Sequence, residues 1–174
     1  MRAFFHARIL VLGAIAVSAG CVDVPEGIEP VTGFQAERYM GRWYEVARLD
    51  HRFERGMEQV TATYELQPDG TVAVLNRGYR ADKGEWAEVS GKAKFLGVPD
   101  VAALKVSFFG PFYGGYNVVD LDPGYQYALI AGPNRSYLWI LARTPTPPRA
   151  EVERLVAKAK ALGYDTSQLI FVQH

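Results

Sequence analysis

The sequence has few of the residues that build cross-links, metal sites and nucleophilic active sites. It contains one cysteine, Cys21, and three histidines among 174 residues. A single cysteine forms no disulfide within the chain and cannot supply a cysteine cluster for zinc. Positive and negative side chains balance, with 19 Lys and Arg against 19 Asp and Glu. Without a basic excess to neutralise phosphates, we expect no nucleic acid partner.

Signals of catalysis are equally scarce. After the N-terminal segment the only histidines are His51 and His174. The sequence has no Ser/His/Asp order, no paired-carboxylate motif, no phosphate-binding loop and no metal-ligand spacing. We therefore expect a protein that is not an enzyme and that uses neither a cofactor nor a metal. The alternative left open is a reaction on a lipid through a tyrosine, Glu45 or Arg80.

The N-terminal apolar run, residues 9–17, is too short to span a hydrocarbon core of about 30 Å. It follows Arg2 and Arg8 and precedes three small residues and Cys21, an order typical of a secretory signal peptide. The cysteine directly after small residues resembles a bacterial lipobox, although Ser18 stands where leucine is usual. We predict a signal peptide over residues 1–20 and a lipid anchor with an extended tether over residues 21–33.

The lipobox resemblance also implies a location. In such lipoproteins the cysteine is acylated, and several acyl chains anchor a protein stably where one does not. Val22 follows Cys21, and by analogy with enteric bacteria the absence of aspartate there favours the outer membrane. We expect the protein to be lipid-anchored at the periplasmic face. An ordinary cleaved signal with an unmodified cysteine is the alternative.

The middle of the chain alternates short apolar stretches with turn residues, and 13% of all residues are aromatic. Asp69-Gly70 and Asp122-Pro123-Gly124 are typical turn sequences. Strands are predicted near residues 43–50, 58–66, 71–80, 85–95, 102–109, 114–121, 125–131 and 137–143. Eight strands joined by hairpin turns favour a β-sandwich or an up-and-down barrel, whose interior is filled by side chains or holds one small ligand.

A helix is predicted after the eighth strand. Pro147 and Pro148 stand where a helix would start, and Gly163 stands where it would end. Apolar residues at helical spacing between them form one face, which we expect to pack on the outside of the barrel. Residues 168–172 are predicted to form a last strand.

Three sequence motifs resemble those of the lipocalins. Gly41-Arg42-Trp43-Tyr44 resembles their G-x-W motif, the segments 119–122 and 125–128 resemble their second motif, and Trp139-Ile140-Leu141-Ala142-Arg143 resembles the third. Residues 51–56 and 108–117 look specifically like the bacterial lipocalins related to apolipoprotein D. The resemblance covers residues 34–174. It implies an all-β fold: an eight-stranded antiparallel up-and-down β-barrel with a C-terminal helix outside, a final short strand and an apolar small molecule inside.

The two ends of the strand series are expected to form the floor of this barrel. Trp43 opens the first strand and Arg143 closes the eighth, so both lie at the same rim of an up-and-down barrel. A guanidinium over an indole face contributes about 0.5–2 kcal/mol. We therefore assign Gly41, Trp43 and Arg143 to structure.

Alternation along each strand predicts which side chains face the cavity. If Trp43 points inward, Glu45, Ala47 and Leu49 do so as well. Because an unpaired buried carboxylate is costly, Glu45 needs a partner, and a structural hydrogen bond near the floor is the favoured interpretation.

Polar side chains at inward-facing positions are the candidate ligand contacts. We expect Asn76, Arg80, Tyr116 and Trp139 to converge on the upper cavity, near the headgroup of an amphiphile whose tail lies inside. Arg80 suits a bidentate contact with a carboxylate or phosphate, or it is a solvated arginine at a strand end. Trp139 is compatible with ligand contact, with core packing, or with both.

The loops at the open end complete the candidate site. They are predicted at residues 51–57, 81–84, 110–113 and 132–136, where they carry Phe53, Phe112, Tyr113 and Arg135. Phe108 is the last inward-facing residue of its strand. An exposed apolar rim of this kind marks an interface, which suits membrane contact or a homodimer.

We interpret the protein as a membrane-anchored carrier or storage protein for a fatty acid or lysophospholipid, in envelope lipid transport or repair. A sterol or another apolar molecule would also fit an aromatic cavity. The alternative is a structural or interaction lipoprotein of the envelope that uses the aromatic barrel mouth.

Overall fold

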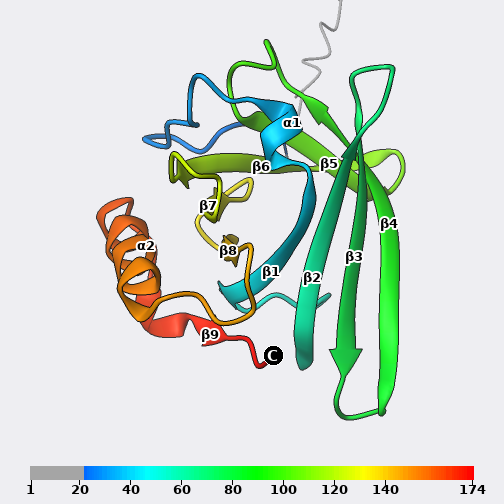
Figure 1. Ribbon diagram of the computed structural model, residues 1–174, viewed down its shortest axis with the longest axis vertical. Coiled ribbons are helices and arrows are strands. Elements are labelled where there is room, and N and C mark those ends of the chain that lie inside the picture. The colour runs from blue at the N-terminus through cyan, green and yellow to red at the C-terminus, as the bar shows by residue number, and fades with distance from the viewer. Residues whose placement is uncertain (1–21) are drawn as a thin grey trace, which may run out of the picture.

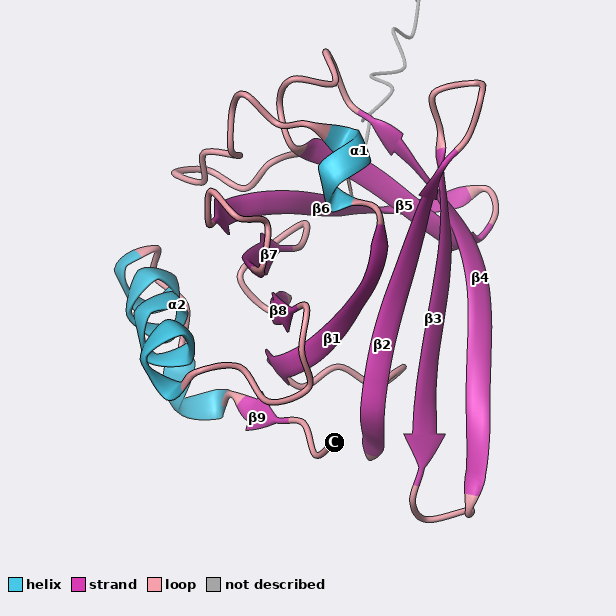
Figure 2. Ribbon diagram, in the orientation of Figure 1, coloured by secondary structure: helices cyan, strands magenta, loops and turns pink. Residues whose placement is uncertain are grey.

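A computed structural model describes residues 22–174, which form one antiparallel sheet with a helix beside it (Figures 1 and 2). The elements are α1 (Ala36–Tyr39), β1 (Gly41–Arg48), β2 (Met57–Leu66), β3 (Val72–Arg80), β4 (Glu85–Phe95), β5 (Ala103–Phe109), β6 (Phe112–Leu121), β7 (Tyr127–Ala131), β8 (Leu138–Ala142), α2 (Arg149–Ala161), a 3₁₀ turn (Thr166–Gln168) and β9 (Ile170–Phe171). The predicted signal peptide and Cys21 lie outside the described residues.

The sheet closes on itself as the sequence predicts. Strands pair in the order β2-β3-β4-β5-β6-β7-β8-β1-β9, and β1 also pairs with β2. That last pairing turns eight strands into a barrel and leaves β9 outside, next to β1. The predicted eight-stranded barrel, the external helix and the final short strand are confirmed.

Local turn chemistry sets the register of the hairpins. In the β2–β3 turn, the Asp69 carboxylate accepts hydrogen bonds from the Thr71 backbone N–H at 3.0 Å and from the Thr71 hydroxyl at 2.6 Å. Gly70 takes a positive φ of 77° there, which favours glycine. Leu66 is thereby placed opposite Val72, so the apolar side chains of β2 and β3 share the inner face.

Two hydrophobic clusters lie on opposite sides of the barrel wall. The inner cluster fills the closed end and includes Trp43 and Val118. The outer cluster lies between the barrel and α2, where Leu155 and Ala159 pack against strand residues such as Ile140. Figure 1 shows α2 beside β7 and β8, outside the barrel. Residues 22–174 thus hold the eight paired strands of the barrel and both clusters.

A short helix that the sequence analysis did not predict seals the closed end. Helix α1 follows Phe34, and both Phe34 and Tyr39 are buried in the inner cluster. The chain before it is also attached to the barrel. The Val31 N–H donates to the Val118 carbonyl at 2.8 Å, and the Val31 carbonyl accepts from Ala102 at 2.9 Å. The end of the predicted tether therefore packs along the barrel wall.

A β-bulge corrects the predicted facing of the second half of β1. The β1–β8 register shifts between Glu45 and Ala47, so simple alternation fails at that point. Trp43 belongs to the inner cluster, whereas Ala47 and Leu49 belong to the outer one. The prediction that Ala47 and Leu49 face the cavity is wrong, and Arg48 turns to the Glu45 side instead.

The C-terminal residues fill a seam between β1 and β2. The β1–β2 pairing ends at Tyr44 and Thr61. Beyond it, the Val172 N–H donates to the Val46 carbonyl at 3.0 Å, and the Gln59 N–H donates to the Gln173 carbonyl at 2.7 Å. The chain end thus supplies hydrogen bonds to both strands where they no longer pair with each other.

Within residues 22–174, neither helix is long and apolar enough to cross a lipid bilayer.

Candidate functional site: the barrel cavity

The barrel contains a cavity of about 1000 Å³. Its wall runs from Phe34 and Tyr39 at the closed end to Arg80, Phe112 and Pro133 at the open end. The wall between is mainly apolar, with Val60, Ala62, Val72, Val74, Ala93, Phe95, Leu104, Val106, Phe108 and Leu141. A concave apolar space with a few polar groups is what a small-molecule site requires.

The closed end is held together by Trp43 and Arg143. The Arg143 guanidinium carbon lies 4.0 Å from the centre of the Trp43 ring. Its N–H groups also donate to backbone carbonyls, including those of Arg42 and Met40 at 2.8 Å each. Gly41 has a φ of 91°, and a Cβ there would lie 3.4 Å from Arg143 Nη1. Every hydrogen bond that Arg143 donates goes to a backbone carbonyl, an arrangement suited to holding structure.

Three tyrosines meet at the inner side of this floor. The Tyr116 hydroxyl lies 2.7 Å from the Tyr39 hydroxyl and 2.9 Å from the Tyr64 hydroxyl. Burial is the main reason that the pKa of each of these three tyrosines is raised, so all three stay protonated. Tyr116 therefore lies deep in the barrel and not among the upper-cavity groups with which the sequence analysis placed it.

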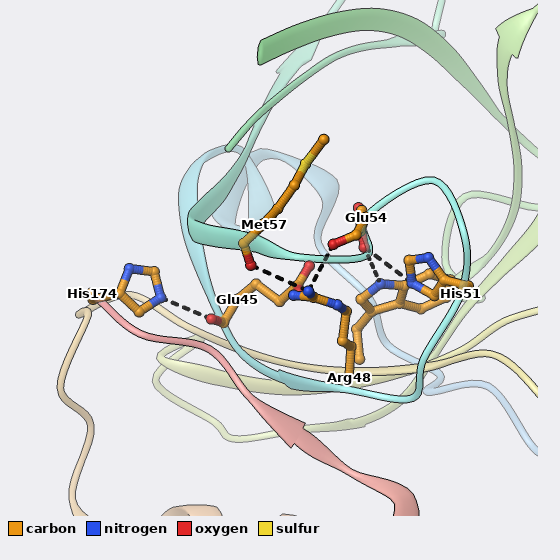
Figure 3. A network of polar contacts seen from close by, with 7 residues as sticks. Glu45, Arg48, His51, Glu54, Met57 and His174 are labelled. Atoms are coloured by element: carbon orange, nitrogen blue, oxygen red, sulfur yellow. Dashed lines mark hydrogen bonds and ion pairs between the residues drawn. The ribbon is translucent and has the colours of Figure 1, made fainter. Parts of the chain in front are cut away.

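A buried polar cluster lies at the cavity wall near the open end of the barrel (Figure 3). The Arg48 guanidinium donates to the Glu45 carboxylate at 2.6 Å and to the backbone carbonyls of Glu54 and Met57 at 2.7 and 3.2 Å. Glu54 comes from the loop after β1, and its carboxylate lies 3.0 Å from His51 Nε2. Arg48 is thus the partner that Glu45 was expected to need.

The Arg48 guanidinium pairs with the carboxylate of Glu45, whereas it contacts Glu54 through the backbone carbonyl. Burial raises the pKa of Glu45 well above its ordinary value, and the nearby Glu54 carboxylate raises it further. Arg48 opposes both effects but does not outweigh them. A proton on Glu45 removes one of two negative charges from an apolar wall, which lowers the cost of burying the pair.

Aromatic rings stack beside the polar cluster, at the rim. The His51 ring lies 4.0 Å from the Phe53 ring and 5.2 Å from the Trp139 ring, measured between centres. The Trp139 indole N–H donates to the Glu54 carboxylate at 3.2 Å. These contacts tie the loop after β1 to β8, so Trp139 both packs and faces the cavity.

Comparison with known proteins places this barrel in a family. The family model for the lipocalin-like domain matches residues 34–174, which is most of the chain. The chain belongs to the lipocalin family. Membership of this family supports a carrier of a small hydrophobic ligand, as the motifs around Trp43 and Arg143 implied.

Relatives of this lipocalin match over nearly the whole chain. The outer membrane lipoprotein Blc of Vibrio cholerae is 51% identical over 99% of this chain and 99% of its own length. The outer membrane lipoprotein Blc of Escherichia coli K12 is 53% identical over 95% of this chain and 97% of its own length. These names support an outer membrane location for this lipocalin. Apolipoprotein D of the rat is 32% identical over 66% of this chain and 64% of its own length.

The solved structure of insecticyanin from the tobacco hornworm Manduca sexta has the same fold. It superposes with a TM-score of 0.68, covers 84% of each chain and shares 19% sequence identity. At that identity the likeness concerns the fold of this lipocalin alone.

The remaining predicted contact residues lie at different depths of the lipocalin barrel. Asn76 lines the cavity midway along β3, and its side-chain oxygen is buried without a hydrogen-bond partner among the described residues. Arg80 lies at the end of β3, half exposed, with only a 3.5 Å contact to Glu85. Arg80 and Trp139 are therefore rim groups, whereas Asn76 lies deeper and Tyr116 lies at the floor.

Some aromatic residues of the mouth line the cavity wall, and others lie exposed at the rim. Phe108 lines the cavity wall, and its position depends on Gly91, where a Cβ would lie 2.6 Å from the Phe108 ring. Tyr113 also lines the cavity, and the Lys105 ammonium lies 4.9 Å from the centre of its ring. Phe53 is exposed over 57% of its surface at the rim.

Arg135, expected at the mouth, turns outward instead. It donates to the Leu162 carbonyl at 3.1 Å and to the Glu26 carbonyl at 2.9 Å. These contacts tie the β7–β8 loop to the segment after α2 and to the N-terminal segment. The Arg135 guanidinium therefore has a structural role.

Several polar residues of the cavity wall, among them Tyr39, Glu54 and Tyr64, were not predicted from the sequence, and neither was Arg48, which is buried beside Glu45. Tyr64 alternates with residues that face the cavity, so the period of β2 was a usable signal. Arg48 and Glu54 could not be placed, because the bulge in β1 and the fold of the following loop leave no pattern in the sequence.

Proposed function

We propose that this lipocalin carries a monoacyl amphiphile, either a fatty acid or a lysophospholipid, for envelope lipid transport or repair. The proposal rests on the long, mainly apolar cavity, whose polar groups lie in two places: near the rim, with Arg80, and at the floor, with Tyr116. An acyl tail would bury its surface against the aliphatic wall, at about 0.8 kcal/mol per CH₂. The headgroup would remain near the rim, where water and polar side chains are available.

Arg80 is the proposed headgroup contact. Its guanidinium is half exposed at the end of β3, and its contact with Glu85 is 3.5 Å long. A guanidinium with so weak a partner can turn to a ligand carboxylate or phosphate and form two parallel hydrogen bonds. Trp139 and Tyr113 would pack on the first methylene groups below it.

This function needs no chemical step. Several polar groups of the cavity contact one another, as do Glu45 with Arg48 and Glu54 with His51 and Trp139. We infer that the cavity binds and does not transform its ligand.

We further propose that acylation of Cys21 anchors the protein to the periplasmic face of the outer membrane. Two relatives are named outer membrane lipoproteins, and the sequence before Cys21 resembles a lipobox. The first described residue, Val22, packs with Asp23 against Gly115 of β6, close to Pro133 of the β7–β8 loop. An anchor at the preceding residue would hold the barrel with this part of its rim near the membrane.

The second candidate function is an interaction role of the aromatic mouth. Phe109 and Phe112 are exposed over 76% and 78% of their surfaces, at the β5–β6 turn. Together with Phe53 they form an apolar rim suited to a membrane surface or to a homodimer. Membrane contact is compatible with carriage, because a tethered carrier must exchange its ligand with a bilayer.

The test of the carrier proposal is a binding titration with oleate and lysophosphatidylethanolamine, followed by tryptophan fluorescence. The Arg80→Ala variant should bind both ligands on the order of tenfold more weakly, because it loses a charge-assisted contact. Arg149→Ala removes a similar side chain from the exposed face of α2 and is the matched control. Equal affinities of the Arg80 variant and the wild type would remove Arg80 from the site but keep the carrier.

A further inference from the structure

The floor of the cavity has one more hydrogen-bond donor than the protein can use. The hydroxyls of Tyr39, Tyr64 and Tyr116 carry three hydrogens, but only two hydrogen bonds join them. No other hydrogen bond to these hydroxyls is found among residues 22–174. Whichever way the two bonds are directed, one hydrogen is left without an acceptor.

This unpaired hydrogen lies beside the cavity. All three tyrosines line it, and Tyr116, which touches both of the others, is the half-buried member of the three. An O–H group that is removed from water without an acceptor costs about 1–3 kcal/mol. The floor is therefore a place where a ligand oxygen would supply a missing partner.

We propose that Tyr39, Tyr64 and Tyr116 form a second polar subsite at the closed end, which binds a neutral hydroxyl or carbonyl oxygen carried on the inner end of the ligand. The inference rests on the carrier function proposed above and narrows its ligand class. An oxygenated acyl chain would place its headgroup at the rim, near Arg80, and the oxygen of its far end at the three tyrosines of the floor.

The charge of the surroundings selects a neutral oxygen over a carboxylate. The nearest guanidinium, Arg143, lies against Trp43 and donates to backbone carbonyls. The walls beside the tyrosines are apolar, with Val72, Val74 and Val118 in the same cluster. A carboxylate at the floor would be buried without a counter-ion, which is far more costly than burying a hydroxyl or carbonyl group.

The distance between the two polar levels suits a long chain. Val74 pairs with Tyr64 across β2 and β3, and Arg80 lies further along the same strand at the rim. The strand from Val74 to Arg80 spans about 20 Å at roughly 3.3 Å per residue. A ligand that touches both levels must therefore extend through most of the barrel.

The experiment compares fatty acids with their ω-hydroxy derivatives, in a length series from dodecanoate to hexadecanoate, on residues 22–174, which hold the barrel strands and both clusters. The measured quantity is the ratio of the dissociation constant of the plain acid to that of the hydroxy acid. The variant Tyr39→Phe/Tyr64→Phe/Tyr116→Phe keeps all three rings and removes the hydroxyls. We expect its ratio to be lower than that of the wild type by on the order of tenfold at the best chain length.

The control variant Tyr79→Phe removes a tyrosine hydroxyl beside Trp86, outside the cavity lining, and should leave the ratio unchanged. Equal ratios in the wild type and the triple variant, with both still binding plain acids, would overturn the floor subsite and keep the carrier. Failure of the wild type to bind any acid would overturn the carrier proposal as well.

If the triple variant does not fold, Tyr116→Phe and an NMR measurement replace it. With ¹³C-labelled tyrosine, the ω-hydroxy acid should shift the Cζ signals of this cluster, and the plain acid of the same length should shift them less. Identical shifts with the two acids would overturn the subsite.

Discussion

The guanidinium of Arg143 lies 4.0 Å from the centre of the Trp43 ring, although the two residues belong to opposite ends of the strand series. Their contact joins the start of β1 to the chain just after β8, and the hydrogen bonds of Arg143 extend it to the carbonyls of α1 and β1. The closed end of the barrel is therefore joined across two segments that are distant in sequence, residues 39–43 and Arg143. These contacts form the floor of the cavity.

Replacement of Arg143 by alanine should lower the free energy of unfolding by about 2–3 kcal/mol, because it removes a cation–π contact and leaves partly buried carbonyls without donors. Urea unfolding followed by tryptophan fluorescence measures the change. Arg42→Ala, at an exposed position of the same floor, is the control and should change the free energy by less than about 0.5 kcal/mol. A stable Arg143→Ala protein would show that the floor does not depend on this contact.

The pair of Glu45 and Arg48 predicts a dependence of stability on pH. The pKa of Glu45 is raised in the folded protein, so the folded state binds this proton more tightly than the unfolded state. The resulting stabilisation is fully present below the ordinary pKa of 4.5 and is lost as the pH rises through the raised value. Glu45→Gln keeps a hydrogen-bond acceptor for Arg48 and removes the titration.

We therefore expect the unfolding free energy of Glu45→Gln to fall less steeply above pH 4.5 than that of the wild type. Chemical unfolding at a series of pH values measures both slopes. Glu65→Gln, at an exposed position of β2, should keep the slope of the wild type. Parallel curves for Glu45→Gln and the wild type would show that Glu45 does not hold its proton in the folded state.

The sequence allowed the fold to be predicted almost completely, because its determinants are local. Turn residues such as Asp69 and Gly70 mark the hairpins, and alternation shows which side of a strand is apolar. The Trp43 and Arg143 motifs mark the start of the first barrel strand and the end of the last. The side chains of Ala47 and Leu49 were predicted to face the wrong side of the wall, because a bulge shifts the alternation of a strand and no residue type in the sequence marks it.

The site was predicted less completely because its groups meet through tertiary contacts. Asn76 and Arg80 were found on the inner face of β3, and the structure places both along the cavity. Tyr116 was predicted to face the cavity, but its position at the floor follows from contacts with Tyr39 of α1 and Tyr64 of β2. Such convergence depends on the barrel register as a whole and on a helix, α1, that is too short to give a periodic signal.

The aromatic mouth should control ligand uptake or association. The double variant Phe53→Ala/Tyr113→Ala removes one ring from the rim and one from the cavity wall. We expect weaker lipid binding, on the order of tenfold, or a lower fraction of dimer in analytical ultracentrifugation. Phe171→Ala, which removes an exposed aromatic ring from β9, is the control. Unchanged affinity and oligomeric state in the double variant would contradict the assignment of the mouth.

The C-terminal segment should keep the seam between β1 and β2 closed. Removal of residues 170–174 deletes the acceptor of the Gln59 N–H and the donor to the Val46 carbonyl. We expect a loss of about 1–3 kcal/mol in unfolding free energy and faster hydrogen exchange at Gln59. Unchanged exchange there would show that the seam is closed without this segment.

The central claim, that the barrel holds one acyl chain inside its cavity, is tested most directly by native mass spectrometry of residues 22–174 with oleate, a lysophospholipid and a sterol. We expect retention of one oleate or one lysophospholipid per barrel. Retention of the sterol alone would contradict the monoacyl ligand. Retention of none of the three would contradict the carrier function and favour the interaction role of the aromatic mouth.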